Sequence, residues 1–175
     1  MIRAAIGLGG NLGHPERAFR EALNRLEAET GIVVSAVSGL WRSAPWGIAD
    51  QPEFLNAAAL LETCREPGDL LAFLQDLERG AGREPGVRWG PRPLDLDLLF
   101  HGDAVVDRAD LTLPHPRLPE RSFVLEPLAE IAPGWIHPVA GKTAAEMLAE
   151  LHASGRATAC RPAGPWAAVE AAGWR

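Results

Sequence analysis

The sequence predicts an α+β fold in which helices pack on a mainly antiparallel sheet. Short apolar segments rich in valine, leucine and alanine are separated by longer segments whose apolar residues recur at helical spacing. Their order along the chain is strand, helix, strand, strand, helix, strand. That order is typical of the ferredoxin-like β-α-β-β-α-β sandwich, an open sheet with helices on one face.

Glycines and prolines delimit the elements of the first half. A glycine-rich turn follows the first apolar segment, Pro15 fits the first turn of a helix, and Gly31 ends that helix. The predicted elements are a strand over 4–8, the helix that begins near Pro15, a strand over 32–41, a loop over 42–51 and a strand over 54–62.

In the second half, Asp69 fits the N-cap of a helix that ends at Gly80 or Gly82. Thr143 and Glu146 have the spacing of a capping box, which opens a helix through 151. The elements predicted between these helices are the strand that holds Asp95 and Asp97, a short strand over 104–106, a proline-rich surface loop over 111–121 and a helical stretch that Ser122 caps over 122–131.

The stretch from residue 83 to residue 100 carries the most specific chemistry. A strand directs successive side chains to opposite faces, so Asp95 and Asp97 share one face while the leucines around them share the other. Two ionised carboxylates about 6–7 Å apart repel each other. A hard divalent cation that also binds water and phosphate removes this conflict. Guanidinium groups that suit phosphate oxygens lie directly upstream, on Arg83, Arg88 and Arg92.

A D-x-D pair on its own is more often a solvated strand face than a metal site, by about two to one. The arginines and the indole of Trp89 within the same stretch reverse that order. Metal ligands and arginines together predict a polyphosphate ligand.

The segment R-W-G-P-R-P-L-D-L-D-L-L at 88–99 resembles the signature of the 6-hydroxymethyl-7,8-dihydropterin pyrophosphokinase family. Further matches lie at 9–13, 50–57, 113–116 and 121–125. The resemblance covers about residues 3–150. The loop from Arg83 to Arg88 is slightly shorter than in relatives and has fewer basic residues, which affects the expected rate and ATP affinity more than the reaction.

The resemblance implies a role for each matching residue. Phe54 and Phe123 are expected to sandwich the pterin ring, with Asn56 at its edge. The other residues expected at the acceptor are Ser43, Ala44, Trp46 and Trp89. Those expected at ATP are Gln75, Glu78, Arg83, Arg88, Trp89, Arg92, Leu98, His115 and Arg121. The expected metal ligands for two Mg²⁺ ions are Asp95 and Asp97, which together with Arg83 and Arg92 form the expected catalytic set.

Taken from the sequence alone, several of these residues have simpler interpretations. Gln75 and Glu78, three apart, share a face that is most simply a solvated helix surface. Each aromatic residue by itself is more often part of a core than a stacking platform. His115 lies between two prolines on a loop, which slightly favours a functional role.

The reaction implied by the resemblance is attack of the acceptor's hydroxymethyl oxygen on the β-phosphorus of ATP. AMP leaves, and the pterin carries the diphosphate, as a step of folate biosynthesis. Positioning and charge stabilisation account for most of the catalysis in such transfers. No dedicated general base is identified. The expected partners are therefore ATP and 6-hydroxymethyl-7,8-dihydropterin, bound by a monomer.

Length, charge and cysteine content limit the number of domains, the possible classes of binding partner and the expected compartment. With 175 residues, 47% of them hydrophobic, the chain fits one domain over 1–152. The extension over 153–175 is compatible with a partly ordered tail or with a docked segment. A net charge of −6 argues against a general nucleic-acid or membrane binder. Two cysteines without a ligand spacing, and no secretory-type apolar run, predict a cytoplasmic protein.

Two other functional classes compete with this interpretation. A non-catalytic regulatory module on the same fold leaves the acids and arginines without a role. A dinucleotide-dependent oxidoreductase built on the turn at 7–13 lacks the third glycine, where Leu12 stands, and the acid that would bind a ribose.

Overall fold

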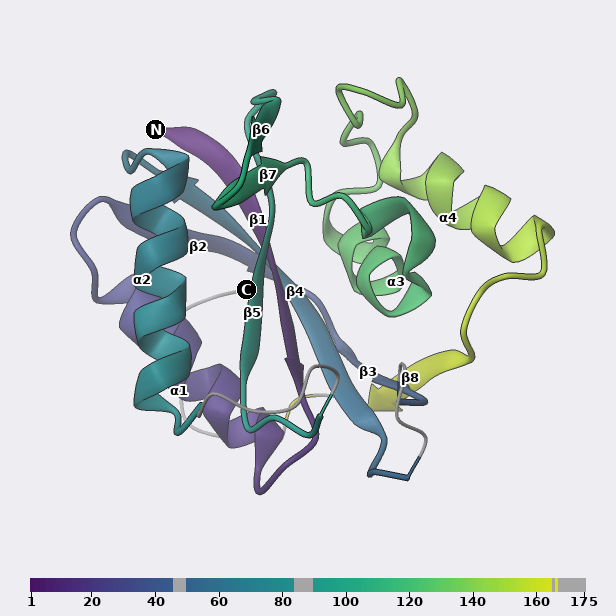
Figure 1. Ribbon diagram of the computed structural model, residues 1–175, viewed down its shortest axis with the longest axis horizontal. Helices are drawn as coiled ribbons and strands as arrows, with labels where there is room; N and C mark the ends of the chain where they lie inside the picture. Colours follow the sequence, from purple (N-terminus) through teal and green to yellow (C-terminus); the bar gives the residue numbers. More distant parts are fainter. Residues whose placement is uncertain (46–49, 84–89, 165, 167–175) are drawn as a thin grey trace.

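The computed structural model describes residues 1–45, 50–83, 90–164 and 166. Its elements are β1 (Ile2–Gly10), α1 (Pro15–Glu27), β2 (Ile32–Val37), β3 (Leu40–Ser43), β4 (Phe54–Thr63), α2 (Pro67–Gly80), β5 (Asp95–His101), β6 (Val106–Arg108), β7 (Leu111–Leu113), η1 (Leu118–Glu120), α3 (Ser122–Ile131), α4 (Ala144–Ala153) and β8 (Cys160–Gly164). A central sheet separates one pair of helices from another (Figure 1).

The central sheet has the order β5-β1-β4-β3-β8, with β2 also paired to β4, and every pairing is antiparallel. The first and last strands of the chain's β-α-β-β-α-β unit, β1 before α1 and β5 after α2, lie side by side, with β5 at the end of the sheet. This is the ordering of the ferredoxin-like sandwich. The predicted α+β fold is therefore confirmed.

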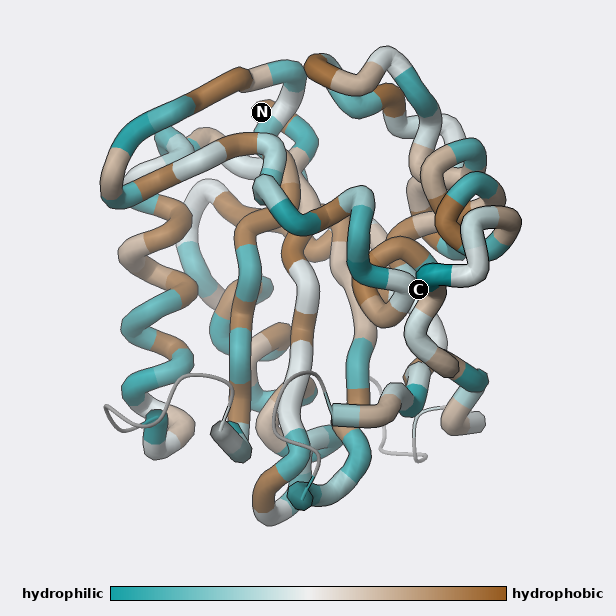
Figure 2. The backbone as a smooth tube through the Cα atoms, turned by 45° about the vertical axis from the view of Figure 1, so that its right-hand side comes forward, coloured by the Kyte–Doolittle hydropathy of each residue, from teal (hydrophilic) through white to brown (hydrophobic). Residues whose placement is uncertain are grey.

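The larger core lies between the sheet and the helices α1 and α2. Phe19 and Leu23 of α1 and Leu70 and Leu74 of α2 are fully buried against it. Both helices carry hydrophobic and hydrophilic residues in turn along their length, as an amphipathic helix on a sheet must (Figure 2). Each buried leucine contributes about 1.5–3 kcal/mol to folding.

A second core lies on the opposite face, under α3 and α4, so the expectation that helices cover one face is wrong. Leu99 and Phe100 of β5 meet Leu125 and Leu128 of α3 and Met147 of α4 there. A register shift in the β1–β5 pairing lets the consecutive residues Leu99 and Phe100 both join this core. The two helices cover only part of this face of the sheet (Figure 1).

The strand predicted over 32–41 is in fact two strands, β2 and β3, which pair with different halves of β4. The break lies at Ser38, whose Oγ accepts a hydrogen bond from the Ala58 amide (2.9 Å) and donates one to the Gly39 carbonyl (2.8 Å). A side chain that bonds the neighbouring backbone interrupts the ladder. As a result Ser43 belongs to a strand and not to the predicted loop.

The capping predictions were correct in one case and wrong in two. Thr143 and Glu146 form the predicted capping box at α4. Asp69 lies inside the first turn of α2, which begins at Pro67. Ser122 is the first residue of α3, and its Oγ donates to the Thr158 carbonyl at 2.8 Å, so it does not cap the helix.

Two further segments differ from the prediction. The proline-rich stretch 111–121 contains β7 and η1, and β7 pairs with β6 in a small second sheet. The chain after α4 returns to the central sheet as β8, which the sequence did not predict. Within the described ranges no helix is long and apolar enough to cross a membrane.

Candidate active site

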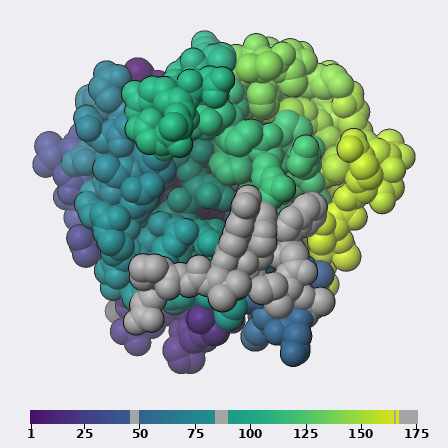
Figure 3. All heavy atoms as spheres, in the orientation of Figure 1, coloured from purple at the N-terminus to yellow at the C-terminus, as the bar shows by residue number. Residues whose placement is uncertain are grey.

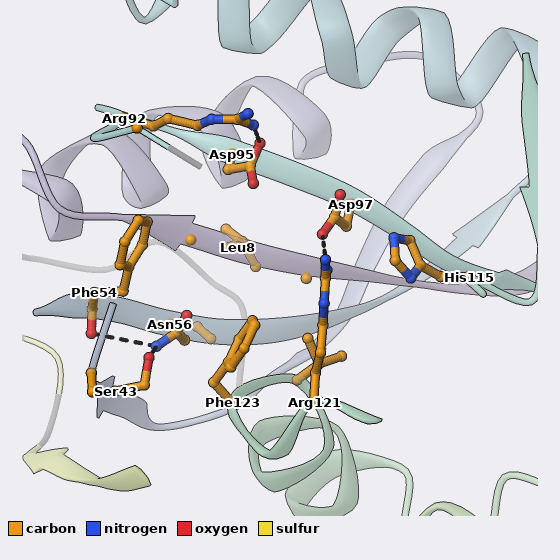
Figure 4. A pocket seen from close by; sticks show the side chains of 16 residues that line it. Leu8, Ser43, Phe54, Asn56, Arg92, Asp95, Asp97, His115, Arg121 and Phe123 are labelled. Carbon is orange, nitrogen blue, oxygen red and sulfur yellow. Dashed lines mark hydrogen bonds and ion pairs between the residues drawn. The ribbon is translucent and has the colours of Figure 1, made fainter. Parts of the chain in front are cut away.

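A cleft of about 250 Å³ lies on the sheet face that carries α3, between β5 on one side and β3, β4 and α3 on the other. The surface is hollowed between the teal and green parts of Figure 3. Asp95 and Asp97 line the β5 side, Phe54, Asn56 and Phe123 line the other, and Arg121 reaches across from the α3 side to Asp97 (Figure 4). The lining residues are Gly7, Leu8, Gly9, Ser43, Ala44, Phe54, Asn56, Ala57, Gly90, Arg92, Asp95, Asp97, His115, Arg121, Phe123 and Val124.

The strand β5 divides its side chains as the alternation predicted. Asp95 and Asp97 line the cleft, whereas Leu96 and Leu98 are buried in the core under α1 and α2. Leu94, directly before the strand, is buried in the same core. The acids can therefore change without altering the apolar packing behind them.

Arginines neutralise both acids. The guanidinium groups of Arg83 and Arg92 pair with Asp95, the former at 3.2 Å from Nη1 to Oδ1. Arg121 pairs with Asp97 at 3.4 Å from Nη1 to Oδ2. These are the arginines that the sequence assigned to phosphates, and a phosphate competes for them with the two carboxylates.

Burial disfavours the charged forms of both Asp97 and Arg121. Burial, and after it the charge on Asp95, raises the pKa of the Asp97 carboxyl. Burial also lowers the pKa of the Arg121 guanidinium, against the opposing effect of Asp97. Among the described residues, nothing accepts a hydrogen bond from the buried Nε of Arg121. Two repelling acids and an incompletely bonded guanidinium are the conditions that a cation and an anion, bound together, would relieve.

A metal at this site would need ligands from a bound molecule. Over residues 1–45, 50–83, 90–164 and 166, no cluster of three or more His, Cys, Asp or Glu side chains could hold a metal ion. The pair of Asp95 and Asp97 supplies only part of a coordination shell. Mg²⁺ usually takes one or two carboxylates and completes its shell with water and substrate phosphates, so these residues fit a Mg²⁺ ion that arrives with a polyphosphate.

His115 lies beside Asp97 at the far end of the charged wall (Figure 4). Burial lowers the pKa of its imidazole, although the charge on Asp97 opposes this shift, so the ring is neutral at neutral pH. Its Nδ1 accepts a hydrogen bond from the Arg117 amide at 3.2 Å, which places the proton on Nε2. His115 is therefore a neutral donor, and its own amide fixes it to β5 through the Leu99 carbonyl at 2.8 Å.

The opposite wall is built around Asn56, which is buried. Its Nδ2 donates to Ser43 Oγ at 2.9 Å and lies 3.4 Å from the carbonyls of Trp41 and Phe54. With the nitrogen committed to these acceptors, Oδ1 is the atom left to accept a hydrogen bond from a ligand. Phe54 and Phe123 lie on either side of this amide (Figure 4).

Two glycines of β1 form the floor between the walls. Gly9 pairs with Asp95 on one side and with Asn56 on the other, and Gly7 pairs with Asp97. A Cβ at Gly9 would point toward Asp95 and Asn56, at 3.8 Å and 3.9 Å from their nearest atoms. The sequence was interpreted as a tight turn at these glycines. They lie within a strand, and their missing side chains leave the space between the walls open.

Glu78 does not lie on a solvated helix face, as its spacing from Gln75 suggested. It is only 3% exposed, whereas Gln75 is exposed. Its carboxylate accepts a hydrogen bond from the Leu96 amide at 2.8 Å and pairs with Arg83. Burial raises the pKa of Glu78 to about 7. The residue supports β5 from behind and does not line the cleft.

Asn11 was missed as an organising residue. Its Oδ1 accepts from the Arg92 amide at 2.9 Å, while its Nδ2 donates to Gln51 Oε1 and to the Pro52 carbonyl, both at 3.0 Å. It thus joins the segments that lead into both walls. The backbone at Gly10 also lies close to the backbone at Pro93, since a Cβ at Gly10 would lie 2.7 Å from the Pro93 carbonyl oxygen. The feature of the sequence that could have identified Asn11 is its position as a polar residue directly after a buried strand.

A second cleft adjoins the first, and some predicted site residues lie outside the described part of the chain. A second cleft of about 240 Å³ shares Asp97 and His115 with the first and is also lined by Leu98, Leu71 and Thr112. Three predicted site residues, Trp46, Arg88 and Trp89, lie outside the described residues.

A family model and the relatives described here name the same enzyme family. Residues 5–133 match the family model of 7,8-dihydro-6-hydroxymethylpterin-pyrophosphokinase. The 2-amino-4-hydroxy-6-hydroxymethyldihydropteridine pyrophosphokinase of Synechocystis sp. is 41% identical over 148 residues, which are 85% of this chain and 75% of the relative. The enzyme of the same name from Methylorubrum extorquens is 44% identical over 155 residues, 89% of this chain and 97% of the relative.

Longer relatives match over part of their length. The mitochondrial folate synthesis bifunctional protein of Arabidopsis thaliana is 49% identical over 126 residues, 72% of this chain but 23% of the relative. A crystal structure of Plasmodium falciparum HPPK-DHPS with pteroate superimposes with a TM-score of 0.68 at 13% identity, over 85% of this chain and 43% of that chain. At this identity the structural match supports the fold alone.

Proposed function

The chain belongs to the 7,8-dihydro-6-hydroxymethylpterin-pyrophosphokinase family, and we propose that the two walls of its cleft divide the family's reaction between them. The protein is an ATP-dependent diphosphotransferase of folate biosynthesis. It transfers the diphosphate of ATP to the hydroxymethyl group of 6-hydroxymethyl-7,8-dihydropterin, giving AMP and the pterin diphosphate. In the proposal, the β5 wall binds the triphosphate and the β3–β4 wall binds the pterin.

One observation supports this division most strongly. Asp95, Gly9 and Asn56 occupy neighbouring positions across three strands of the sheet. A carboxylate suited to a metal-bound phosphate and an amide suited to a heterocycle are thus separated only by a residue without a side chain. Transfer between two substrates requires this closeness, because reacting atoms must approach to about 3–3.5 Å.

The charged wall would bind the triphosphate by exchange of partners. Arg83 and Arg92 now pair with Asp95, and Arg121 pairs with Asp97. The guanidinium groups of these arginines would pair with phosphate oxygens, and the carboxylates of Asp95 and Asp97 would hold the cation. His115 adds a neutral N–H donor from Nε2, in keeping with its hydrogen bond at Nδ1. These donors stabilise the charge that develops as the bond to AMP breaks.

Asp95 and Asp97 would hold two Mg²⁺ ions, with the remaining ligands supplied by phosphate and water. Bound Mg²⁺ supplies charge neutralisation at the phosphates and polarises oxygen ligands. The second cleft, which continues from Asp97 and His115 past Leu98, would take the nucleoside end of ATP. Gln75 and Glu78 lie on α2, and Glu78 would act through Arg83, with which it pairs.

The opposite wall would hold the acceptor. Phe54 and Phe123 offer faces for a flat ring, and Asn56 Oδ1 accepts from its amino or amide groups. Ser43 fixes the amide, and the backbone around Ala44 adds further edge contacts. The hydroxymethyl group then points across Gly9 toward the charged wall, where its oxygen forms the new bond to the β-phosphorus. The partners proposed are these two substrates only, bound by a monomer in the cytoplasm, where the thiols Cys64 and Cys160 stay reduced.

The direct test incubates the purified chain with ATP, Mg²⁺ and 6-hydroxymethyl-7,8-dihydropterin and follows AMP and the pterin diphosphate. We expect both products in equal amounts, none without the pterin, and none when a chelator removes the metal. Release of ADP, or AMP formation independent of the pterin, would contradict the proposed function.

A further inference from the structure

The segment after α4 is built into the acceptor side of the cleft. Cys160 pairs with Ser43, Pro162 with Trp41 and Gly164 with Leu40, so β8 runs antiparallel along β3. These residues lie beyond the match to the family model, which ends at residue 133. The C-terminal clamp, defined here as residues 160–164 together with Trp166, therefore contacts the strand that ends at the acceptor wall.

Strand β3 needs support on this side. It has four residues, Leu40–Ser43, and pairs with β4 only from Trp41 to Ser43. A strand this short, bonded along one edge, is marginal by itself. Ser43 is its last residue and accepts the hydrogen bond that orients Asn56. Movement of β3 would thus reach the amide that is proposed to bind the pterin.

A two-pronged ion pair fixes the register of the clamp. Nη1 and Nη2 of Arg161 donate to the two carboxylate oxygens of Glu53, at 2.7 Å and 2.9 Å. Glu53 directly precedes Phe54, the aromatic residue of the acceptor wall. A planar fork on a carboxylate restricts both distance and orientation. Neither Arg161 nor Glu53 lines the cleft, so the pair leaves it free.

Trp166 anchors the other end of the clamp. Its Nε1 donates to the Ser38 carbonyl at 2.9 Å, just before β3 begins. Its ring lies edge-on to Phe19, with centroids 6.3 Å apart, and the Arg20 guanidinium lies 5.3 Å from the ring centroid. The clamp therefore holds β3 at both ends, at Ser38 through Trp166 and at Ser43 through Cys160.

We propose that the C-terminal clamp is a positioning element for the acceptor, which holds β3 so that Ser43 and Asn56 present a fixed edge to the pterin. This inference rests on the proposed function, because it assigns the acceptor to the β3–β4 wall. It makes the affinity for the pterin depend on residues that do not touch it. ATP, on the opposite wall, is bound independently of the clamp.

The test uses charge reversal in the full-length protein. Arg161→Glu and Glu53→Arg are made singly and together, and calorimetry measures the Kd of the pterin in the presence of a non-hydrolysable ATP analogue and Mg²⁺, and separately the Kd of the analogue. Each single variant is expected to weaken pterin binding by about fivefold to tenfold, with a change of less than about twofold for the analogue. The double variant restores the ion pair in reverse and is expected to recover most of the lost affinity.

Lys142→Glu is the matched control, since it reverses one charge of an exposed pair with Glu150 (2.6 Å) on α4, outside the cleft. It should change neither Kd. Trp166→Ala tests the other anchor and should weaken only pterin binding, by a similar factor. Equal weakening of both ligands, or no recovery in the double variant, would overturn the positioning role.

These outcomes separate the clamp from the proposed function. If the wild-type protein binds the pterin and releases AMP while the clamp variants bind it equally well, the clamp proposal alone is wrong. A single variant that loses affinity for the pterin and regains it in the double variant supports the clamp by binding alone, whatever the rate of AMP release. Wild-type protein that fails to bind the pterin in the ATP-bound state contradicts the proposed function and the clamp built on it.

Discussion

The two walls of the cleft differ in charge although they are strands of one sheet. The β5 wall carries Asp95 and Asp97, with Arg83 and Arg92 paired to Asp95, while Arg121 reaches Asp97 from the start of α3. The residues that line the cleft from β3 and β4 in the described part of the chain, Phe54 and Asn56 among them, are uncharged. In the proposed function, phosphate chemistry and heterocycle binding are assigned to different strands with β1 between them, and the two groups of residues meet at the start of α3, where the Arg121 guanidinium lies over the Phe123 ring. Substitutions should therefore affect one substrate or the other.

The largest effect is expected at the charged wall. Asp95→Ala and Asp97→Ala should each lower kcat by about 10³-fold or more, because each removes a proposed metal ligand and a partner of the arginines. Stability should change by less than about 1 kcal/mol, since both side chains face the cleft. Initial rates of AMP release and urea unfolding measure the two effects. Asp76→Ala, which removes an exposed acid on α2, serves as the control.

The next largest effect is expected at the uncharged wall. Asn56→Ala removes the link to Ser43 and the proposed hydrogen-bond partner of the pterin, and should raise the KM for the pterin by about 10–100-fold. The KM for ATP should stay within about twofold. Ser35→Ala, which removes a side-chain hydrogen bond to the Leu60 carbonyl farther along β4, is the control. Equal changes in both KM values would mean that the walls do not act separately.

An intermediate effect on both substrates is expected at Asn11, which connects the two walls. Asn11→Ala removes side-chain hydrogen bonds to the segments at Arg92 and at Gln51 and Pro52. Both KM values should rise a few-fold, and the free energy of unfolding should fall by about 1–3 kcal/mol. Steady-state kinetics and urea unfolding test this, with the exposed Asn24→Ala on α1 as the control. A change confined to one substrate would place Asn11 in a single wall.

The smallest effect concerns the support behind the charged wall. Burial raises the pKa of Glu78 from 4.5 to about 7, so the folded protein holds this proton more tightly than the unfolded chain does. Its contribution to stability is complete below about pH 4.5 and is lost as the pH rises through about 7. The urea concentration at the midpoint of unfolding should therefore fall when the pH is raised from about 6 to about 8. The fall should be less steep in Glu78→Gln. The same slope in both proteins would show that Glu78 does not titrate in this range.

The sequence was most informative where a local pattern determines the structure. Alternation around Asp95 and Asp97 placed the acids on one face and the leucines on the other because a strand has a period of two. The capping box at Thr143 was also local. The burial of Glu78 was not predictable in this way, because it depends on Arg83 and on the Leu96 amide, which come from other segments.

Long-range pairing accounts for the other differences. β8 contains Pro162, Ala163 and Gly164, residues of low strand propensity, and it forms because β3 offers a free edge. The glycines of β1 were interpreted as a turn because their partners, Asp95 and Asn56, lie far away in sequence. The role of these glycines as the floor of the cleft follows from the pairing of the strands, which the sequence alone does not give.

In the proposed function, Asp95 and Asp97 hold the metal that accompanies the triphosphate, on a wall separate from the acceptor. Calorimetry with a non-hydrolysable ATP analogue, with and without Mg²⁺, tests it directly in the wild-type protein and in Asp97→Ala. Mg²⁺ should tighten analogue binding strongly in the wild type and by less than about twofold in the variant. An equal effect of Mg²⁺ on both proteins would contradict it.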